Sequence, residues 1–259
     1  MDVPDQQPAG SESQPATIGL LEGLATTRAI RRYRPEPIPA EDIAKLLYYA
    51  TRAPNGGNQQ KWRFVVLGPD AHEAREVLGK AAKIGWDELR HVYGYDKGSA
   101  LDTTSRKGRM GAVMERFART FTEIPLLIIA CAVDPPKKDH PTGAAGSVMP
   151  ACHNLMLAAR AMGYGGTLST WQRHVEAELR DVLAIPDNAV MLAIMTLGRP
   201  EGNHGPVRRR PLTSVVYDRT WGNPPSWAAD LDAVPPAHGH RADGPVTATP
   251  DATTAPKVM

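Results

Sequence analysis

Cysteine and long apolar runs are both scarce in this 259-residue sequence. It has two cysteines, Cys131 and Cys152, and no CxxC pair, so the sequence suggests neither a disulfide framework nor a zinc site. No apolar run approaches the roughly 18 residues that a membrane helix needs. The longest, IPLLIIACAV, has the length of a buried strand. We therefore expect a cytoplasmic protein with reduced thiols and no membrane partner.

A strong excess of charge of one sign is also absent. The net charge of +2 gives no reason to expect nucleic-acid binding as a main activity. The opening stretch MDVPDQQPAGSESQPA has no basic region followed by an apolar core, so we do not interpret it as a secretory signal. The sequence has no GxSxG, HExxH, phosphate-binding Walker loop or EF-hand spacing. We expect no metal site and no catalytic side chain of those types.

Composition divides the chain into three parts. Residues 1–16 are rich in Pro, Ser, Gln and Gly, which predicts a disordered tail. Residues 17–222 carry the apolar patterns of one folded domain. Residues 223–259 are dominated by Pro, Ala, Gly and Thr, so they cannot form much core. They form either a free tail or an arm on another surface.

Apolar periodicity predicts both helices and strands in the central part. The first expected helix is Glu41–Thr51, which starts near Pro39 and is ended by Pro54. A second helix is capped by Asp70 and runs to about Ala82. A third covers Ser147–Met162 and is closed by Gly163 and Gly165, and a fourth covers His174–Leu183. The expected strands are WRFVVL, LLIIACAV, which should be central, and AVMLAIMTLG. Residues 84–122 are expected to form helices with a mobile connection. Few intervals resemble tight βαβ units, so we predict an α+β sandwich whose sheet is covered by helices.

Two basic clusters could bind phosphate. TTRAIRRYRPEP holds Arg28, Arg31, Arg32 and Arg34, and VRRRP holds Arg208 and Arg210. Guanidinium groups bind phosphate oxygens through paired hydrogen bonds. Solvated surface charge is the alternative for both clusters, and they could converge only through the fold.

Two loops are rich in glycine. RAPNGGNQQKWRF contains neutral amides but no acid or nucleophile. Such amides both donate and accept hydrogen bonds, so they could bind the polar edge of a flat ring. Alternatively, they could bond to nearby backbone groups and form a turn. GYGGTLSTW resembles a phosphate-binding loop, but it follows a helix rather than a strand. We therefore reject a dinucleotide-binding Rossmann motif there and keep a helix cap with a turn as the alternative.

The order of these segments resembles the nitroreductase family over roughly residues 20–222. The stretch TTRAIRRYRPEPIPAEDIAKLLYYATRAPNGGNQQKWRFVVL is similar to the family's opening basic segment, amphipathic helix, A-P-S-x-x-N-x-Q-P-W-x-F loop and strand. PLLIIACAV, HNLMLAARAMGYGGTLSTW and MTLGRP followed by PLTSVVYDRTW continue the match in order. The resemblance implies an α/β/α sandwich with a mixed, mainly antiparallel sheet, in an entwined homodimer.

The resemblance also implies FMN as cofactor and NADH or NADPH as co-substrate. The residues that it places at the cofactor are Arg28, Arg31, Arg32, Asn55, Gly56, Asn58, Gln60, Gly165, Gly166, Arg208 and Arg210, with Leu168 and Ser169 as neighbours. The register of the resemblance does not decide whether Arg31 or Arg32 lies at the flavin. Ala29 or Ile30 stands where the family often has serine, and Asn55 also replaces a serine. The resemblance places the substrate wall in residues 86–120, with Trp86, Tyr93, Tyr95, Arg109, Met110 and Phe117 as candidates.

The implied activity passes hydride from the nicotinamide through flavin N5 to an electron-poor acceptor, such as a nitroaromatic or quinone, with ping-pong kinetics. The flavin performs the chemistry, so no catalytic side chain is assigned. Three alternatives stay open: a flavin-binding protein without activity, a dehalogenating member and a flavin-cleaving member. Glu88, Tyr93 and Lys107 only approximate the Glu-Tyr-Lys lid of the dehalogenating members.

Overall fold

A computed structural model describes residues 18–134 and 142–228 of the chain. These residues fall into two units, Met1–Val207 and Arg208–Met259, which we describe separately. The predictions for residues 1–16, and for residues 229–259 of the C-terminal stretch, lie outside the described residues.

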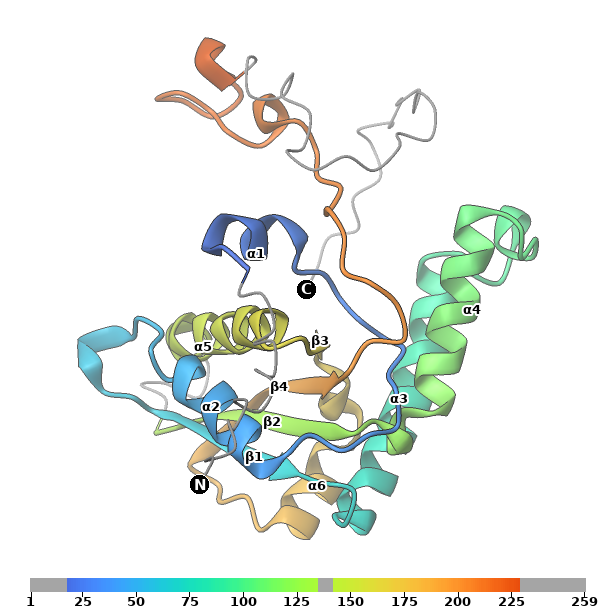
Figure 1. Ribbon diagram of the computed structural model, residues 1–259, viewed down its shortest axis with the longest axis vertical. Coiled ribbons are helices and arrows are strands. Elements are labelled where there is room, and N and C mark those ends of the chain that lie inside the picture. Colours follow the sequence, from blue (N-terminus) through green and yellow to red (C-terminus); the bar gives the residue numbers. More distant parts are fainter. Residues whose placement is uncertain (1–17, 135–141, 229–259) are drawn as a thin grey trace, which may run out of the picture. The chain divides into compact units, whose positions relative to one another are not determined.

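The first unit is built on a four-stranded antiparallel sheet (Figure 1). Its strands are β1 (Trp62–Leu67), β2 (Leu126–Val133), β4 (Ala189–Gly198) and β3 (Gly165–Ser169), in that spatial order. Leu126–Ala132 of β2 is wholly buried, which confirms the central position expected for this run. Among the described residues, parallel pairing is confined to an isolated bridge between Ala29 and Gly166. The expected mainly antiparallel sheet is confirmed.

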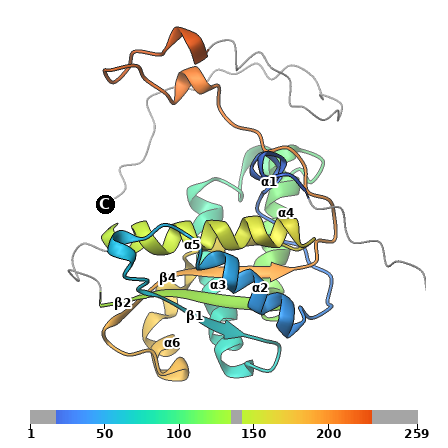
Figure 2. The same ribbon diagram turned by 60° about the vertical axis from the view of Figure 1, so that its left-hand side comes forward.

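Helices cover both faces of this sheet (Figure 2). One face packs against α2 (Ala40–Ala50) and α5 (Thr142–Ala161), and α1 (Leu20–Thr26) lies on α5. The other face packs against α3 (His72–Val92), α4 (Arg106–Arg119) and α6 (Glu176–Leu183). Successive side chains of β2 alternate between the two cores, with Leu127 and Ile129 in one and Ile128 and Ala130 in the other. Burying each Leu or Ile contributes about 1.5–3 kcal/mol. Helices on both faces of one sheet make the α/β/α sandwich that the resemblance implied.

Several predicted boundaries need correction. Helix α3 continues ten residues beyond Ala82, because its buried face continues through Gly85 and Trp86. Asp70 does not cap it: Ala71 occupies the cap position and makes no side-chain cap bond. Helix α6 begins at Glu176, after a 3₁₀ turn over Trp171–Val175.

The end of α5 also differs from the prediction. Gly163 has the positive φ (77°) of a residue that follows a helix, but Gly165 begins strand β3 and is not a cap residue. This strand was missed, because GGTLS has no apolar alternation and owes its extended form to pairing with β4.

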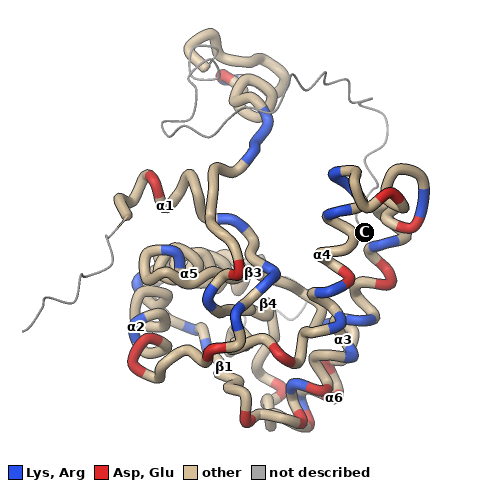
Figure 3. The backbone as a smooth tube through the Cα atoms, turned by 45° about the vertical axis from the view of Figure 1, so that its right-hand side comes forward, with Lys and Arg blue, Asp and Glu red and all other residues tan. Residues whose placement is uncertain are grey.

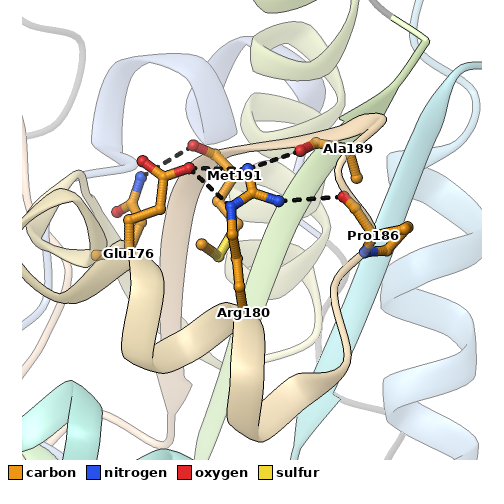
Figure 4. A network of polar contacts seen from close by, with 6 residues as sticks. Glu176, Arg180, Pro186, Ala189 and Met191 are labelled. Atoms are coloured by element: carbon orange, nitrogen blue, oxygen red, sulfur yellow. Dashed lines mark hydrogen bonds and ion pairs between the residues drawn. The ribbon is translucent and has the colours of Figure 1, made fainter.

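Polar contacts join α6 to the start of β4 (Figure 4). Arg180 pairs with Glu176 at 2.8 Å and donates to the carbonyls of Pro186 (3.1 Å) and Ala189 (2.8 Å). Gln172 donates to the Met191 carbonyl at 3.4 Å. These bonds hold the connection that leads into the central part of the sheet.

Candidate active site

The first basic segment lies along the edge of the sheet, beside β3 and the end of β4. The Ile30 amide donates to the Gly166 carbonyl at 2.8 Å, and the Arg34 amide donates to the Arg199 carbonyl at 2.8 Å. An antiparallel bridge joins Tyr33 to Pro200. The segment thus extends the sheet, and Figure 3 shows that basic residues lie beside β3 and β4. Extended backbone sends successive side chains to opposite sides, so neighbouring arginines have different surroundings.

Two glycines allow this close approach. A Cβ on Gly166 would lie 2.1 Å from the Thr196 carbonyl oxygen, and one on Gly165 would lie 2.6 Å from Ile30 Cγ1. Both residues are buried among protein atoms. The structure therefore gives both glycines a packing role: Gly165 admits the basic segment, and Gly166 lets β3 lie close to β4. The half-exposed residues of this strand are Leu168 and Ser169, at its far end.

A cavity of about 230 Å³ opens at that far end. Its wall combines one guanidinium with apolar, aromatic and hydroxyl groups: Arg31, Leu89, Met114, Phe117, Thr167, Leu168, Ser169, Thr170 and Trp171. A smaller cavity of about 100 Å³ also has Arg31 in its wall, together with Arg32, Tyr33 and Arg116. Arg31 is the cation that both spaces share.

The surroundings of Arg31 separate it from Arg32. Burial lowers the pKa of Arg31, and the positive charge of Arg28 also lowers it, while Tyr33 and Tyr95 raise it. An arginine stays protonated even so. Arg32 is exposed. The half-buried Arg31 is thus the better placed of the two for an anionic or electron-rich ring.

Tyr33 fixes the segment that carries Arg31. Its hydroxyl lies 2.7 Å from Thr196 Oγ1 on β4 and also donates to the Ile30 carbonyl. Burial raises the pKa of Tyr33, so its hydroxyl stays neutral and available as a donor. These bonds hold the backbone on either side of Arg31.

A cationic group gathers near the start of β3. His204 Nε2 lies 3.1 Å from the Tyr164 carbonyl oxygen, while its Nδ1 is buried and has no hydrogen-bond partner. Burial lowers the pKa of His204, and the charges of Arg160 and Arg28 lower it further. Arg160 also donates to Thr26 Oγ1 at 3.2 Å. The two guanidinium groups are donors of the kind that bind an anionic group such as a phosphate.

The amide loop lies elsewhere. Asn55 Oδ1 accepts from the Gln60 amide at 2.8 Å, Gln60 Nε2 donates to Asn58 Oδ1 at 3.2 Å, and Gly56 N donates to Ser147 Oγ at 3.3 Å. Ser147 lies near the start of α5, whereas Arg160 lies near its end, about 20 Å away at 1.5 Å per residue. Figure 1 shows the loop and the basic segment at opposite ends of the sheet layer. Neither cavity lined by Arg31 includes a residue of this loop.

The expected substrate residues separate into three groups. Phe117 lines the larger of the two Arg31 cavities. Trp86 is buried, donates to the Glu115 carboxylate and packs against the Tyr95 ring, 5.5 Å between centroids. Tyr93 and Met110 are exposed, and Arg109 donates to the Thr104 carbonyl. The first two groups belong to the same hydrophobic core, but only Phe117 reaches the cavity wall.

Arg208 and Arg210 belong to the second unit, where both are exposed. Of the cofactor residues expected from the sequence, the first unit therefore gathers Arg28, Arg31, Arg32, Gly165 and Gly166 at one edge of the sheet. His204, Arg160 and Met114 were not predicted. Their residue types carry no spacing signal, and only the fold brings them to this edge.

In the part of the chain that the structure describes, no three His, Cys, Asp or Glu side chains are grouped to hold a metal ion. The helices described there include none with the length and apolarity to cross a membrane.

Comparison with known proteins assigns the chain to a family. The family model described as "Nitroreductase family" matches residues 24–199. The NADH dehydrogenase of Thermus thermophilus is 29% identical over 210 residues, 79% of this chain and 99% of that protein. Iodotyrosine deiodinase 1 of Rattus norvegicus is 29% identical over 189 residues, 70% of this chain and 62% of that protein.

Solved structures share the fold. The FMN and NADPH-dependent nitroreductase NfnB from a Sphigopyxis strain aligns with a TM-score of 0.60 at 19% identity, over 79% of this chain and 100% of that one. Since the family model spans well over half of the sequence, the chain belongs to the nitroreductase family.

Proposed function

We propose that this protein is an FMN-dependent oxidoreductase that uses NADH or NADPH to reduce an electron-poor acceptor, such as a nitroaromatic or a quinone. Membership of the nitroreductase family supports this, as do a relative named as an NADH dehydrogenase and a structural neighbour named as FMN and NADPH-dependent. When bound, FMN supplies the redox chemistry by accepting hydride at N5 and passing it on.

The observation that carries the proposal is the position of Arg31. Its guanidinium lines a cavity that is otherwise apolar or hydroxylic, beside the exposed end of β3. Phe117 and Trp171 supply apolar surface for a flat ring, and Arg31 balances negative charge on that ring. Arg28, with the cationic group around it, would hold the phosphate.

We propose further that a second copy of the chain completes the site. The cavity of about 230 Å³ is smaller than the roughly 300–1,000 Å³ of most small-molecule sites. The amide loop bonds to Ser147, which lies about 20 Å along α5 from Arg160, the residue that bonds to Thr26 just before the basic segment. A symmetric partner is therefore the simplest source of these amides. A hollow of about 980 Å³ between α2 and α5, beside the exposed Tyr48 and Tyr49, offers a surface for that partner.

The reaction requires no protein acid or base in this scheme. The chain's part is to bind the cofactor, to orient it with Arg28 and Arg31, and to shield one cavity that admits donor and acceptor in turn. One shared cavity implies ping-pong kinetics. Glu88 pairs with Arg173 (3.4 Å) and lies 3.5 Å from His174, whereas Lys107 lies over the Tyr95 ring. No observation therefore favours a Glu88-Tyr93-Lys107 lid of the dehalogenating type.

The direct test measures flavin content and turnover. Wild-type protein should purify with FMN or take it up, and should oxidise NADH or NADPH when a nitroaromatic or quinone is added. Arg31→Ala should lower turnover at least tenfold, while Lys80→Ala, an exposed change on α3, should not. A protein that cannot be reconstituted with FMN would refute the proposal. Bound flavin that neither nicotinamide reduces would support a binding protein instead.

Complementation tests the second copy. Arg31→Ala and a chain with Asn55→Ala and Asn58→Ala should each be impaired as homodimers. When the two are unfolded and refolded together, mixed dimers regain one intact site each, so activity should recover to about a quarter of wild type. A mixture no more active than its components would show that one chain supplies both groups.

A further inference from the structure

Arg116 of α4 forms a bidentate ion pair with Glu201, which lies shortly after the end of β4. Its Nη2 donates to Glu201 Oε1 at 2.6 Å, and its Nη1 donates to Glu201 Oε2 at 3.1 Å. The two side chains are 47% and 30% exposed. Even a well-aligned pair at this exposure adds only modestly to stability, so variants that break it should still fold.

The pair lies beside the smaller of the two cavities that Arg31 lines. That cavity, of about 100 Å³, has Arg31, Arg32 and Arg116 in its wall. The Glu201 amide donates to the Arg32 carbonyl at 3.1 Å, so the backbone of Glu201 is tied to the segment that carries Arg31. The ion pair with Arg116 therefore fixes the direction of a carboxylate that is anchored beside this cavity.

The positive charge of Arg31 is not matched by a carboxylate. Among the described residues, no Asp or Glu is one of the groups whose charges shift the pKa of Arg31. Glu123 also lines the small cavity, but it is exposed. Glu201 is the carboxylate tied to the basic segment, and both of its oxygens are bonded to Arg116. The half-buried guanidinium of Arg31 thus keeps its charge for a ligand.

Loss of Arg116 alone would leave the Glu201 carboxylate without its partner. Arg31 and Arg32 are then the guanidinium groups that the rest of the cavity wall offers it. Charges at partly buried positions are screened by salt less than fully exposed ones, so the freed carboxylate would act on Arg31. It would offset part of the positive charge of that guanidinium.

We infer that Arg116 is a positioning residue: by holding Glu201, it keeps that carboxylate away from Arg31 and preserves the positive charge that Arg31 presents to the flavin. This rests on the proposed function and adds Arg116 and Glu201 to it. In this scheme Arg116 touches neither the cofactor nor the acceptor. It acts through Arg31 on the negative charge that the flavin ring carries when reduced.

The two members of the pair have opposite expected effects. Arg116→Met frees a negative charge beside Arg31, so reduced FMN should bind more weakly relative to oxidised FMN. Glu201→Gln frees the positive charge of Arg116, so reduced FMN should bind more tightly. The double variant removes a neutral pair and should restore the wild-type ratio. If the pair only held α4 in place, either single change would break the same contact and have the same effect.

The size of the effect follows from Coulomb's law. A single charge about 10 Å from the ring, through an effective dielectric constant of about 20, changes an equilibrium constant roughly tenfold. For a two-electron reduction, a tenfold change corresponds to about 30 mV in midpoint potential. We expect Arg116→Met to lower the potential of bound FMN by about this amount. Glu201→Gln should raise it by less, because the freed Arg116 is the more exposed and the more screened of the two.

The test measures the midpoint potential of FMN bound to the full-length protein, by reductive titration against a reference dye. Fluorescence titration gives the affinity for oxidised FMN, which should change little. Arg116→Lys keeps the charge and should keep the potential close to that of wild type. Lys80→Met and Glu178→Gln each break another exposed ion pair, of 2.6 Å between α3 and α6, and neither should shift the potential. Urea unfolding of the flavin-free variants checks that each one folds.

Opposite shifts that cancel in the double variant would support the inference. Shifts of the same sign in both single variants would mean that the pair only holds α4 in place. Unchanged potentials in both would mean that the Glu201 charge does not reach the flavin. Either of these results overturns the inference and leaves the proposed function intact. Wild-type protein that does not bind FMN would refute the function and the inference together.

Discussion

At the scale of single residues, Arg75 shows how a buried cation can serve the fold alone. It is 4% exposed and donates to the carbonyls of Leu67 (2.9 Å), Gly68 (3.1 Å), Thr122 (3.1 Å) and Ile124. Burial lowers its pKa, and Asp70 raises it. Four of its five N–H donors are used on the backbone at the end of β1 and in the turn before β2, so it joins two strands to α3.

Arg75→Leu should therefore destabilise the protein by about 3 kcal/mol, because it leaves buried carbonyls without donors. Urea unfolding followed by circular dichroism measures this. Arg75→Lys restores one donor group and should recover part of the loss. Arg63→Leu is the control, since this exposed arginine donates only to nearby carbonyls. Equal stabilities for Arg75→Leu and Arg63→Leu would contradict the role.

Tyr33 joins the fold to the candidate site. Tyr33→Phe keeps the ring but removes the hydroxyl contacts with Thr196 and Ile30. The expected loss is about 1–2 kcal/mol in stability, and a several-fold weaker binding of FMN, because Arg31 sits between these anchored residues. Lys83→Met, an exposed change on α3, should change neither quantity. Unchanged FMN affinity in Tyr33→Phe would show that the segment is held by its backbone bonds alone.

At the scale of elements, the contact between α3 and the turn Trp171–Val175 depends on one glycine. A Cβ on Gly85 would lie 2.3 Å from Trp171 Cδ1. A methyl group there requires either the indole or the helix to move, and Trp171 lines the candidate cavity. The packing of Gly85 against Trp171 therefore leaves no room for a larger side chain behind the candidate cavity.

Gly85→Ala should cost about 1–3 kcal/mol through overpacking. Gly111→Ala in α4 is the matched change: its Cβ would meet Tyr95 Cδ1 at 3.4 Å, an ordinary contact. It should be neutral or stabilise by up to about 1 kcal/mol, through helix propensity. Thermal melts of both variants compare them directly. A stable Gly85→Ala protein with an unshifted tryptophan emission would be inconsistent with this packing.

Sequence reasoning succeeded where an element carries its own signal. The apolar runs of β1, β2 and β4 and the amphipathic α2 were predicted with nearly the observed bounds. It failed for β3, whose conformation comes from partners on β4 and on the basic segment. The arginine cluster could be predicted as a phosphate-binding segment from its residue type and spacing. The distinction between Arg31 and Arg32 was not, because it depends on which side of an extended chain faces a cavity.

The same limit explains why His204 was missed. A single histidine in a loop has no pattern, and only the fold brings its ring to the Tyr164 carbonyl at the start of β3. The amide loop illustrates the opposite case. Its residues were recognised as unusual, yet a single chain leaves them bonded to one another and far from Arg31.

At the scale of the whole molecule, the two thiols report on global unfolding. Cys131 and Cys152 are buried on opposite faces of the sheet, one in each core. Burial raises the pKa of Cys131 to about 11 and that of Cys152 to about 12. Since only the thiolate reacts, both should be inert while the chain is folded.

A disulfide reagent at pH 8 should therefore modify neither thiol of the native protein and both after denaturation. The stability contributed by neutral thiols is complete below the ordinary pKa near 9 and is lost as the pH rises toward 11–12. Stability should thus decline above pH 9, and less steeply in a Cys131→Ala, Cys152→Ala protein. Rapid modification of the native chain would indicate that one core opens locally.

The pairing of the basic segment with β3 and β4 also sets the order in which the molecule can be assembled during synthesis. Tyr33 leaves the ribosome long before its partner Pro200 exists. At about 5–20 residues per second, the segment waits roughly 10–30 s for the strand that will hold it. The arginines are therefore among the last groups to reach their places, and a cofactor present in the cell would meet a site that closes only when translation of the domain is nearly complete.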